Sequence, residues 1–281
     1  MICWMFPGQP LKFAEPLPDD DDFNRIAALC RDRADFDLMT CTPLSRAMSE
    51  HTRLQIFGTA MSLYHAGMLR RTGKIPDVVA QHSMGIYPAL ATCGVLGEGD
   101  ALALAARIGI CMSAMGKERE YALGCVVGLQ ASALEGLLAG RSVYVANYNT
   151  SRHFLLSGLL KDMHSVLDAA KNDGAFSGSV FPCDAPLHTP LMAELSQELR
   201  AIIADYCYEP PVIPLMTHQA ELLDGADQIR SFLHDELLQA VHWEQTWYAL
   251  KEMGVESFVE LGVGDSLKKL NRWIESEYLT R

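Results

Sequence analysis

Apolar residues along this chain form short runs broken by turns, and the spacing within each run predicts its secondary structure. Runs typical of strands lie at residues 2–6, 78–80, 212–216 and 257–261. Helical spacing occurs at residues 54–69, 86–95, 101–115, 191–206 and 243–253, and a last helix is predicted from residue 266. This alternation is typical of an α/β fold with a hydrolase-like, parallel-sheet core. Residues 23–47 show a mixed pattern to which we assign no boundaries.

The pattern changes between residues 121 and 186. Strands are predicted at residues 125–129, 143–148, 153–159 and 177–182, with helices at 131–139 and 161–171. The order βαββαβ is the split arrangement of a ferredoxin-like unit. We therefore expect residues 121–186 to form a ferredoxin-like subdomain inserted into a core made of residues 1–120 and 187–281.

The strand predicted at residues 78–80 leads into a short polar segment that contains Ser83 and Gly85, and a helical pattern follows. Strand, tight turn with a serine and helix form the layout of a nucleophile elbow. The start of the helix directs free N–H groups toward whatever the serine attacks, and a glycine suits the sharp turn because it has no Cβ. The usual pattern is G-x-S-x-G, whereas Gln81 occupies the first position here. The alternative is a serine at an ordinary helix N-cap.

Composition is that of a soluble globular protein, with 49% hydrophobic and 21% charged residues among 281. We find no apolar run of about 18 residues, so no membrane span is expected. The N-terminal segment lacks the basic start and long apolar stretch of a signal peptide.

A net charge of −12 argues against nucleic acid as a main partner. The eight cysteines form no C-x-x-C pair, and several lie within apolar runs, which favours buried free thiols in a reducing cytoplasm. The nine histidines show no zinc-site spacing, so no metal is expected.

Several segments carry a family resemblance, in order and nearly from end to end. They are Phe6-Pro7-Gly8-Gln9, Gln55, Gln81-His82-Ser83-Met84-Gly85, Ala146-Asn147-Tyr148-Asn149 with Ser157-Gly158, His188 with Met192, Val241-His242-Trp243, and Glu260-Leu261-Gly262-Val263-Gly264. They resemble the motifs FPGQ, GHSxG, ANYN…SG, PVxW and EvGPG of the malonyl-CoA:acyl-carrier-protein transacylase family, which includes the acyltransferase domains of polyketide and fatty-acid synthases.

The resemblance implies a two-step acyl transfer. Ser83 attacks the thioester of an acyl-CoA donor, and His188 acts as general base and then acid. The acyl-serine passes its group to the phosphopantetheine thiol of an acyl carrier protein, with ping-pong kinetics. The backbone N–H groups of Gln9 and Met84 hold the oxyanion, and the backbone carbonyl of Glu236 orients the histidine. The resemblance implies no bound cofactor, and we expect a monomer.

The resemblance also places a set of residues around the substrate pocket. They are Gln55, His82, Arg107, Ile108, Asn147, Asn149 and Leu187. His82 is expected to orient the site rather than to react. For Asn147 and Asn149 the alternative is a role as ordinary turn residues, and for His188 it is a helix-start histidine bonded within its own loop.

The chain departs from the malonyl-selective members at one position that matters. Those members carry an arginine on the helix after the elbow, where it pairs with the free carboxylate of the substrate. An ungapped count from Ser83 brings that position to Ile108. The neighbouring Arg107 is turned by about 100° around the helix. We therefore expect a neutral, non-carboxylated acyl group. A register slip that brings Arg107 into the pocket would instead give a malonyl transacylase.

Other functions stay open. Arginine-free members of the family include hydrolases that release acyl groups from acyl carrier protein. An ordinary α/β-hydrolase esterase and a non-catalytic module that docks a carrier are further alternatives. An acidic carrier would need a basic surface, for which two groups are available, Arg70, Arg71 and Lys74 or Lys268, Lys269 and Arg272.

Overall fold

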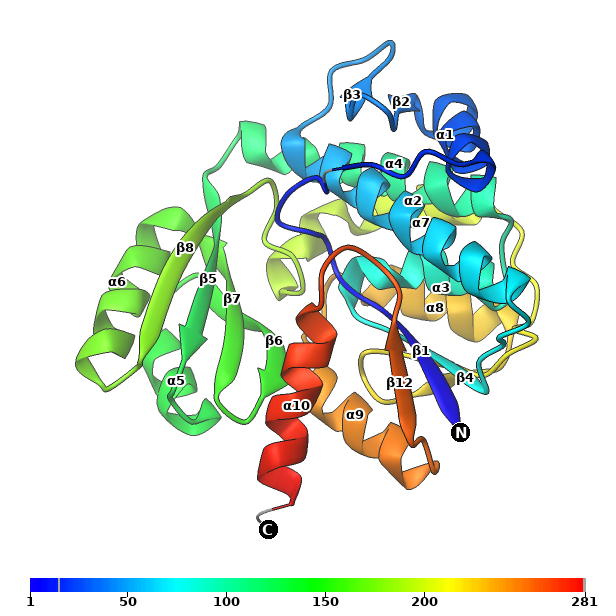
Figure 1. Cartoon of the computed structure of the whole chain (residues 1–281). Coiled ribbons are helices and arrows are strands. Elements are labelled where there is room, and N and C mark those ends of the chain that lie inside the picture. The colour runs from blue at the N-terminus through cyan, green and yellow to red at the C-terminus, as the bar shows by residue number, and fades with distance from the viewer. Residues whose placement is uncertain (15, 280–281) are drawn as a thin grey trace.

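The structure is a computed structural model that describes residues 1–14 and 16–279 (Figure 1). Its first sheet has the strand order β10-β9-β4-β1-β12. The strands are β1 (Ile2–Phe6), β4 (Val78–Gln81), β9 (Leu215–Met216), β10 (Leu222–Leu223) and β12 (Ser257–Glu260). All neighbours are parallel except β10, which runs antiparallel to β9. The predicted α/β fold with a mainly parallel sheet is confirmed.

Helices cover both faces of this sheet. They are α1 (Asp21–Ala34), α2 (Glu50–Arg71), α3 (Ile86–Thr92), α4 (Glu98–Ser113), α7 (Ser196–Ala204), α8 (Ala226–Asp235), α9 (Trp243–Glu252) and α10 (Ser266–Tyr278). Trp4 and Phe6 of β1 pack with α1 to α4, α7 and α8, whereas Cys3 and Met5 pack with α9 and α10. Alternate residues of a strand point to opposite faces, so a continuous apolar run such as residues 2–6 is what burial on both faces requires.

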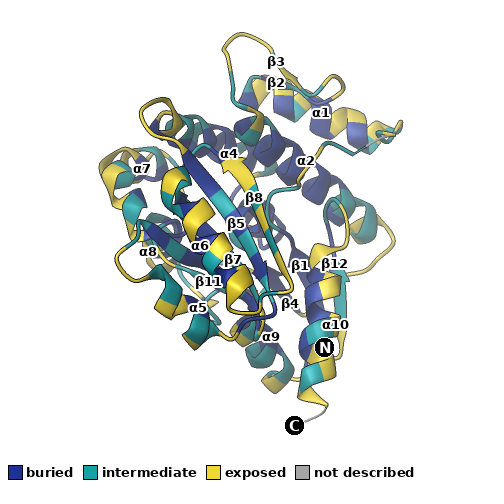
Figure 2. Ribbon diagram, turned by 90° about the vertical axis from the view of Figure 1, so that its left-hand side faces the viewer, coloured by how far each residue is buried: buried dark blue, intermediate teal, exposed yellow. Residues whose placement is uncertain are grey.

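A second sheet has the strand order β11-β6-β7-β5-β8. Its elements are β5 (Tyr121–Val127), α5 (Ala131–Leu138), β6 (Val143–Thr150), β7 (His153–Leu159), α6 (Leu160–Asn172), β8 (Ser177–Cys183) and β11 (Val241–His242). The four strands β5 to β8 pair antiparallel, and α5 and α6 pack on them. Figure 2 shows the outer side of α6 exposed and much of β5 buried.

The fifth strand of this sheet, β11, comes from outside residues 121–186 and runs parallel to β6. The second sheet is therefore not built by residues 121–186 alone. The division of the chain at residues 120 and 187 stays a prediction.

Several predicted boundaries differ from the structure. Helix α4 begins at Glu98 with Gly97 as its N-cap, three residues before the predicted start at 101, and Asp100 pairs with Arg33. The segment predicted as one helix over residues 191–206 splits into a 3₁₀ helix, Pro190–Leu195, and α7. Strand β5 begins four residues before the predicted 125.

Some elements were not predicted at all. They are α1, α8, the short strands β2 (Phe36–Asp37) and β3 (Thr42–Pro43), β10 and β11. Helix α1 is capped by Asp20, whose carboxylate accepts the N–H of Phe23, and it buries Phe23, Ile26 and Cys30 at helical spacing. That signal is present in the sequence.

Residues Glu98–Lys117, which include α4, are long and apolar enough to cross a membrane by length and composition. This corrects the expectation that the chain has no such run. In the structure 56% of that window is buried inside the protein. Helix α4 packs against α1, α2, α3 and α7, so it serves as a core helix of this fold.

Candidate active site

The elbow lies where β4 ends beside the end of β1. Ser83 follows β4 at the start of a 3₁₀ helix, Ser83–Gly85, with φ of 52°, in the left-handed region. A Cβ on Gly85 would lie 2.2 Å from the carbonyl oxygen of Phe6. Only glycine fits this close backbone approach, which holds the turn against β1.

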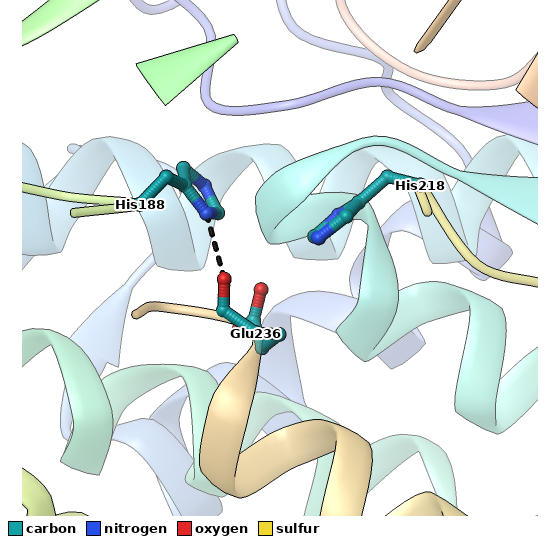
Figure 3. Close-up of side chains that lie close together, drawn as sticks. All are labelled: His188, His218 and Glu236. Carbon is teal, nitrogen blue, oxygen red and sulfur yellow. Dashed lines mark hydrogen bonds between the residues drawn. The ribbon is translucent and has the colours of Figure 1, made fainter. Parts of the chain in front are cut away.

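Ser83 and His188 lie together although 105 residues separate them in the chain. The distance between Ser83 Oγ and His188 Nε2 is 2.7 Å. His188 is buried and has φ of 57°. Its Nδ1 lies 2.9 Å from the backbone carbonyl oxygen of Glu236, a contact drawn in Figure 3. Because a carbonyl only accepts, Nδ1 carries the proton, and Nε2 is left to accept the Ser83 hydroxyl.

Burial also sets the charge of this histidine. It lowers the pKa of His188 to about 4, so the ring is neutral near pH 7. A neutral imidazole with a free Nε2 lone pair beside a hydroxyl is the arrangement that general-base catalysis requires.

The side chain of Glu236 is itself buried beneath His188 and is 2% exposed. Its Oε2 has no hydrogen-bond partner among the described residues. Burial raises the pKa of this carboxyl to about 8. The acid is therefore largely protonated near pH 7.

His218 is a site residue that the sequence analysis missed. Its Nδ1 accepts the backbone N–H of Ser83 at 3.1 Å, and its ring lies edge-on to that of His188 with centroids 5.4 Å apart. Figure 3 shows both rings on the same side of Glu236. His218 follows β9, which is parallel to β4, so both strands end at the same edge of the sheet. Its position after the apolar run at residues 212–216 was the available signal.

His188, His218 and Glu236 each offer one possible metal-ligand atom, and these atoms lie within 4.8 Å of one another. Both nitrogens of His188 and Nδ1 of His218 already take part in hydrogen bonds. A metal ion bound by His188 would displace Ser83 or the Glu236 carbonyl. The arrangement thus functions as a hydrogen-bonded network around the serine.

Gln9 and Met84 are the predicted oxyanion residues. Met84 follows Ser83 at the start of the 3₁₀ helix, where the first N–H groups lack an intrahelical partner. Gln9 lies just beyond β1, and its Nε2 bonds Nδ1 of His51 at 3.0 Å.

Three predicted pocket residues, His82, Asn147 and Asn149, contact one another next to Ser83 in the chain. His82 Nε2 lies 3.1 Å from Asn149 Oδ1 and 3.5 Å from Asn147 Nδ2. Trp243 packs edge-on against the His82 ring at a centroid distance of 5.7 Å. Because Asn147 and Asn149 belong to β6, these contacts tie the second sheet to the elbow.

A small hollow with room for about one water molecule includes Leu187, the residue before His188, in its lining and is called here the acyl hollow. Its lining is Gln9, His51, Thr52, Gln55, Gly109, Met112, Cys183, Asp184, Ala185 and Leu187. The predicted pocket residues Gln55 and Leu187 line it.

Ile108 and Arg107 do not line the acyl hollow. Ile108 is packed into the core at 1% exposure, and its neighbour Gly109 takes the lining position. Arg107 points elsewhere, because its guanidinium lies 2.6 Å from Asp205 Oδ2 and over the ring of Tyr206. The assignment of Ile108 and Arg107 to the substrate pocket stays a prediction.

Comparisons with known proteins agree on one family. The family model described as "Acyl transferase domain" matches residues 31–265. The polyketide biosynthesis protein ThaF of Burkholderia thailandensis is 29% identical over 202 residues, which are 71% of this chain and 17% of that protein. The malonyl CoA-acyl carrier protein transacylase of Bacillus subtilis is 27% identical over 217 residues, covering 74% of this chain and 68% of the relative.

Solved structures show the same fold. The malonyl CoA-acyl carrier protein transacylase from Coxiella burnetii superposes with a TM-score of 0.88 at 25% identity, over 98% of this chain and 91% of that one. The chain spans less than a fifth of ThaF, so it corresponds to a small part of that protein.

Proposed function

The chain belongs to the acyl transferase domain family and is an acyltransferase, and we propose that it moves an acyl group from coenzyme A to the phosphopantetheine thiol of an acyl carrier protein. The observation that carries the proposal is the 2.7 Å contact between Ser83 Oγ and His188 Nε2, with His188 Nδ1 on the Glu236 carbonyl. The names of the transacylase relatives support the carrier as acceptor.

The first half of the reaction loads the enzyme. Ser83 Oγ attacks the thioester carbonyl carbon while its proton passes to His188 Nε2. The carbon–sulfur bond then breaks, and His188 returns that proton to the coenzyme A sulfur. The backbone N–H groups of Gln9 and Met84 stabilise the oxyanion. The products are acyl-serine and free coenzyme A.

The second half runs through the same atoms in reverse. The carrier thiol gives its proton to His188 and attacks the acyl-serine carbonyl, the ester carbon–oxygen bond breaks, and the proton returns to Ser83 Oγ. Each half-reaction leaves His188 neutral, as its lowered pKa favours. Ping-pong kinetics follow from this scheme.

We also propose that the acyl group carries no carboxylate. A malonyl carboxylate in a buried pocket would need a cation, since leaving it unpaired costs several kcal/mol. Among the described residues that line the acyl hollow there is no lysine or arginine. Arg107, the nearest alternative in sequence, is engaged by Asp205.

One incubation tests the transfer. The protein is mixed with radiolabelled acetyl-CoA, with and without a holo acyl carrier protein. Label on the carrier supports the proposal, whereas label released as free acid means a hydrolase. An unlabelled Ser83 contradicts both. Malonyl-CoA that loads Ser83 faster than butyryl-CoA contradicts the proposed substrate class alone.

We propose that the carrier docks on Lys268, Lys269 and Arg272 of α10. Helix α10 follows β12, which is parallel to β1 and β4, so its start lies at the sheet edge where Ser83 sits (Figure 1). The group at residues 70–74 precedes β4 and therefore lies at the opposite edge. Ion pairing does not separate the two groups, because Arg70 and Arg71 are engaged by the Thr92 carbonyl and by Asp22, and Lys269 pairs with Asp265.

Charge reversal tests this surface. Lys268→Glu is expected to raise KM for the carrier and leave acylation of Ser83 by acyl-CoA unchanged. Lys74→Glu, at the opposite edge, is the matched control. An equal rise in KM for both variants would contradict the assignment.

We further propose that the enzyme acts as a monomer in the cytoplasm. The cytoplasmic setting is supported by its eight free cysteines, all within the described residues.

A further inference from the structure

The two residues of the dyad share an unusual backbone conformation. Ser83 has φ of 52° and His188 has φ of 57°, both in the left-handed region that residues other than glycine seldom adopt. Such a conformation persists only where the surrounding structure holds it in place. The contacts that hold Ser83 and His188 are therefore part of what positions the reacting atoms.

The end of helix α8 supplies the contact that holds His188. Glu236 is the C-cap residue of α8, and its N–H donates to the Phe232 carbonyl at 2.8 Å. The carbonyl of a C-cap residue has no partner within its helix. The Glu236 carbonyl is thus free to accept the N–H of His188 Nδ1 at 2.9 Å.

His218 supplies the corresponding contact to Ser83. Its Nδ1 accepts the Ser83 N–H at 3.1 Å, so this nitrogen carries no proton. Burial holds the pKa of His218 well below its usual range, which keeps the ring neutral. A neutral ring without a proton on Nδ1 carries it on Nε2. This Nε2–H is buried and has no acceptor among the described residues.

The side chain of Glu236 offers an acceptor close to this N–H group. A ring nitrogen of His218 and a carboxyl oxygen of Glu236 lie within 4.8 Å of each other, and Glu236 Oε2 is buried without a partner in the described chain. Phe232, one turn earlier on α8, packs against the His218 ring with centroids 5.3 Å apart, and Figure 3 shows that ring directed toward Glu236. Two hydrogen bonds through one water span about 4.5 Å. One water molecule is therefore enough to join the two groups.

We propose that the Glu236 side chain accepts the His218 Nε2–H through one bridging water, so that Glu236 anchors both residues of the dyad. Its carbonyl holds His188, and its carboxyl holds the histidine that holds Ser83. A protonated carboxyl keeps acceptor capacity, so the contact does not require an ionised acid. The Glu236 side chain is a positioning group, because it acts on Ser83 only through His218. The inference rests on the proposed acyl transfer and gives it a further positioning residue.

Single-turnover loading of Ser83 by acetyl-CoA, followed by intact-protein mass spectrometry, tests the proposal. The amplitude reports the fraction of folded enzyme, and the rate constant does not depend on that fraction. Glu236→Leu removes the acceptor. We expect its rate constant at saturating acetyl-CoA to fall by about three- to tenfold, the equivalent of one hydrogen bond. The half-saturating concentration of acetyl-CoA should stay unchanged.

Two further variants show whether the acceptor oxygen is what matters. Glu236→Gln keeps an oxygen at this place and is expected to recover most of the rate. A Glu236→Gln enzyme as slow as Glu236→Leu would overturn the proposal. Glu252→Leu is the matched control, because Glu252 is an exposed glutamate at the end of α9. It should load Ser83 at the rate of the wild type.

A double-mutant cycle separates this role from packing. Glu236→Leu is combined with His218→Leu, which removes the other end of the contact. If the carboxyl acts through His218, adding Glu236→Leu to His218→Leu should lower the rate constant by less than about twofold. An equal loss in both backgrounds would mean that Glu236→Leu acts on His188 or on packing alone, and it would overturn the proposal.

The outcomes also separate this inference from the proposed function. If no acyl-CoA loads Ser83 of the wild-type enzyme, the proposed acyl transfer is wrong. If acetyl-CoA loads the wild type and the cycle shows no coupling between Glu236 and His218, acyl transfer stands and only the role of the Glu236 side chain is wrong.

Discussion

The atoms that react differ from the polar atoms of the acyl hollow in how they are paired. At the catalytic end, Ser83 Oγ, Ser83 N–H and both nitrogens of His188 have partners within the protein, whereas Glu236 Oε2 and His218 Nε2 have none in the described chain. At the acyl end, Gln55 Oε1 and Asp184 Oδ2 have none in the described chain. The comparison teaches that the reacting atoms are organised before substrate arrives, as electrostatic preorganisation requires.

The largest expected effect is at the catalytic end. His188→Ala removes the group that accepts the Ser83 proton, so the rate of acyl-serine formation should fall by about 10²–10⁴-fold. Mass spectrometry of the acyl-enzyme with acetyl-CoA measures it. His164→Ala on the exposed side of α6 is the control. A loss below tenfold would mean that another group acts as the base.

Gly85→Ala tests whether the elbow is fixed by backbone contact. The new Cβ would overlap the Phe6 carbonyl, so β1 or the turn must shift. We expect the free energy of unfolding to fall by about 1–3 kcal/mol or more, together with most of the loading activity. Chemical denaturation and the loading assay measure both. Gly136→Ala on α5 has open space around its Cβ and should be neutral or stabilising.

His218 is a positioning residue, because it acts on the backbone of Ser83 and not on the acyl group. His218→Leu leaves the Ser83 N–H without its acceptor, and we expect kcat for transfer to fall by about tenfold with KM unchanged, a loss near 1.4 kcal/mol. His218→Asn, which can offer an oxygen near the Nδ1 position, should recover most of the rate. Equal loss in both variants would show that ring packing, not the hydrogen bond, is what His218 supplies.

Glu236 gives the catalytic end a pH dependence of stability. Burial raises the pKa of its carboxyl to about 8 from a usual value of 4.5. Between these values the folded protein binds a proton that the unfolded chain has released, so the free energy of unfolding decreases as pH rises, by up to about 1.4 kcal/mol per pH unit. Glu236→Gln should remove this decrease, so the stability of the variant relative to the wild type grows from pH 5 to 8. Parallel curves from urea denaturation would contradict the buried acid.

The smallest effect is expected at Arg107. Its side chain is 40% exposed and that of Asp205 60%, so Arg107→Gln should cost less than about 1 kcal/mol of stability. The ratio of malonyl to butyryl loading should stay unchanged, because the guanidinium does not reach the acyl hollow. A selective loss of malonyl loading would instead mean that Arg107 contacts the substrate. The acyl group would then have a protein partner for its carboxylate.

Much of the secondary structure could be predicted from the local pattern of apolar and polar residues. The apolar runs of β1 and β4 are buried on both faces, so their composition alone identifies them. Helix α8 was missed although Ile229, Phe232 and Leu233 follow helical spacing, so that signal was present and unused. The start of α4 was misplaced because Asp100 is a good N-cap residue in isolation, whereas Gly97 begins the helix and Asp100 binds Arg33.

The sequence by itself determined the α/β class, the serine turn and the histidine that a family resemblance paired with it, because each depends on residues near one another or on a motif. The tertiary structure alone decided what those residues meet. His218 reaches Ser83 only because β9 lies parallel to β4. Strand β11 joins the second sheet although its first residue, Val241, lies 58 residues after Cys183, the end of β8. The partner of Arg107 and the unpaired oxygens of Gln55 and Asp184 follow from long-range packing, which no local spacing encodes.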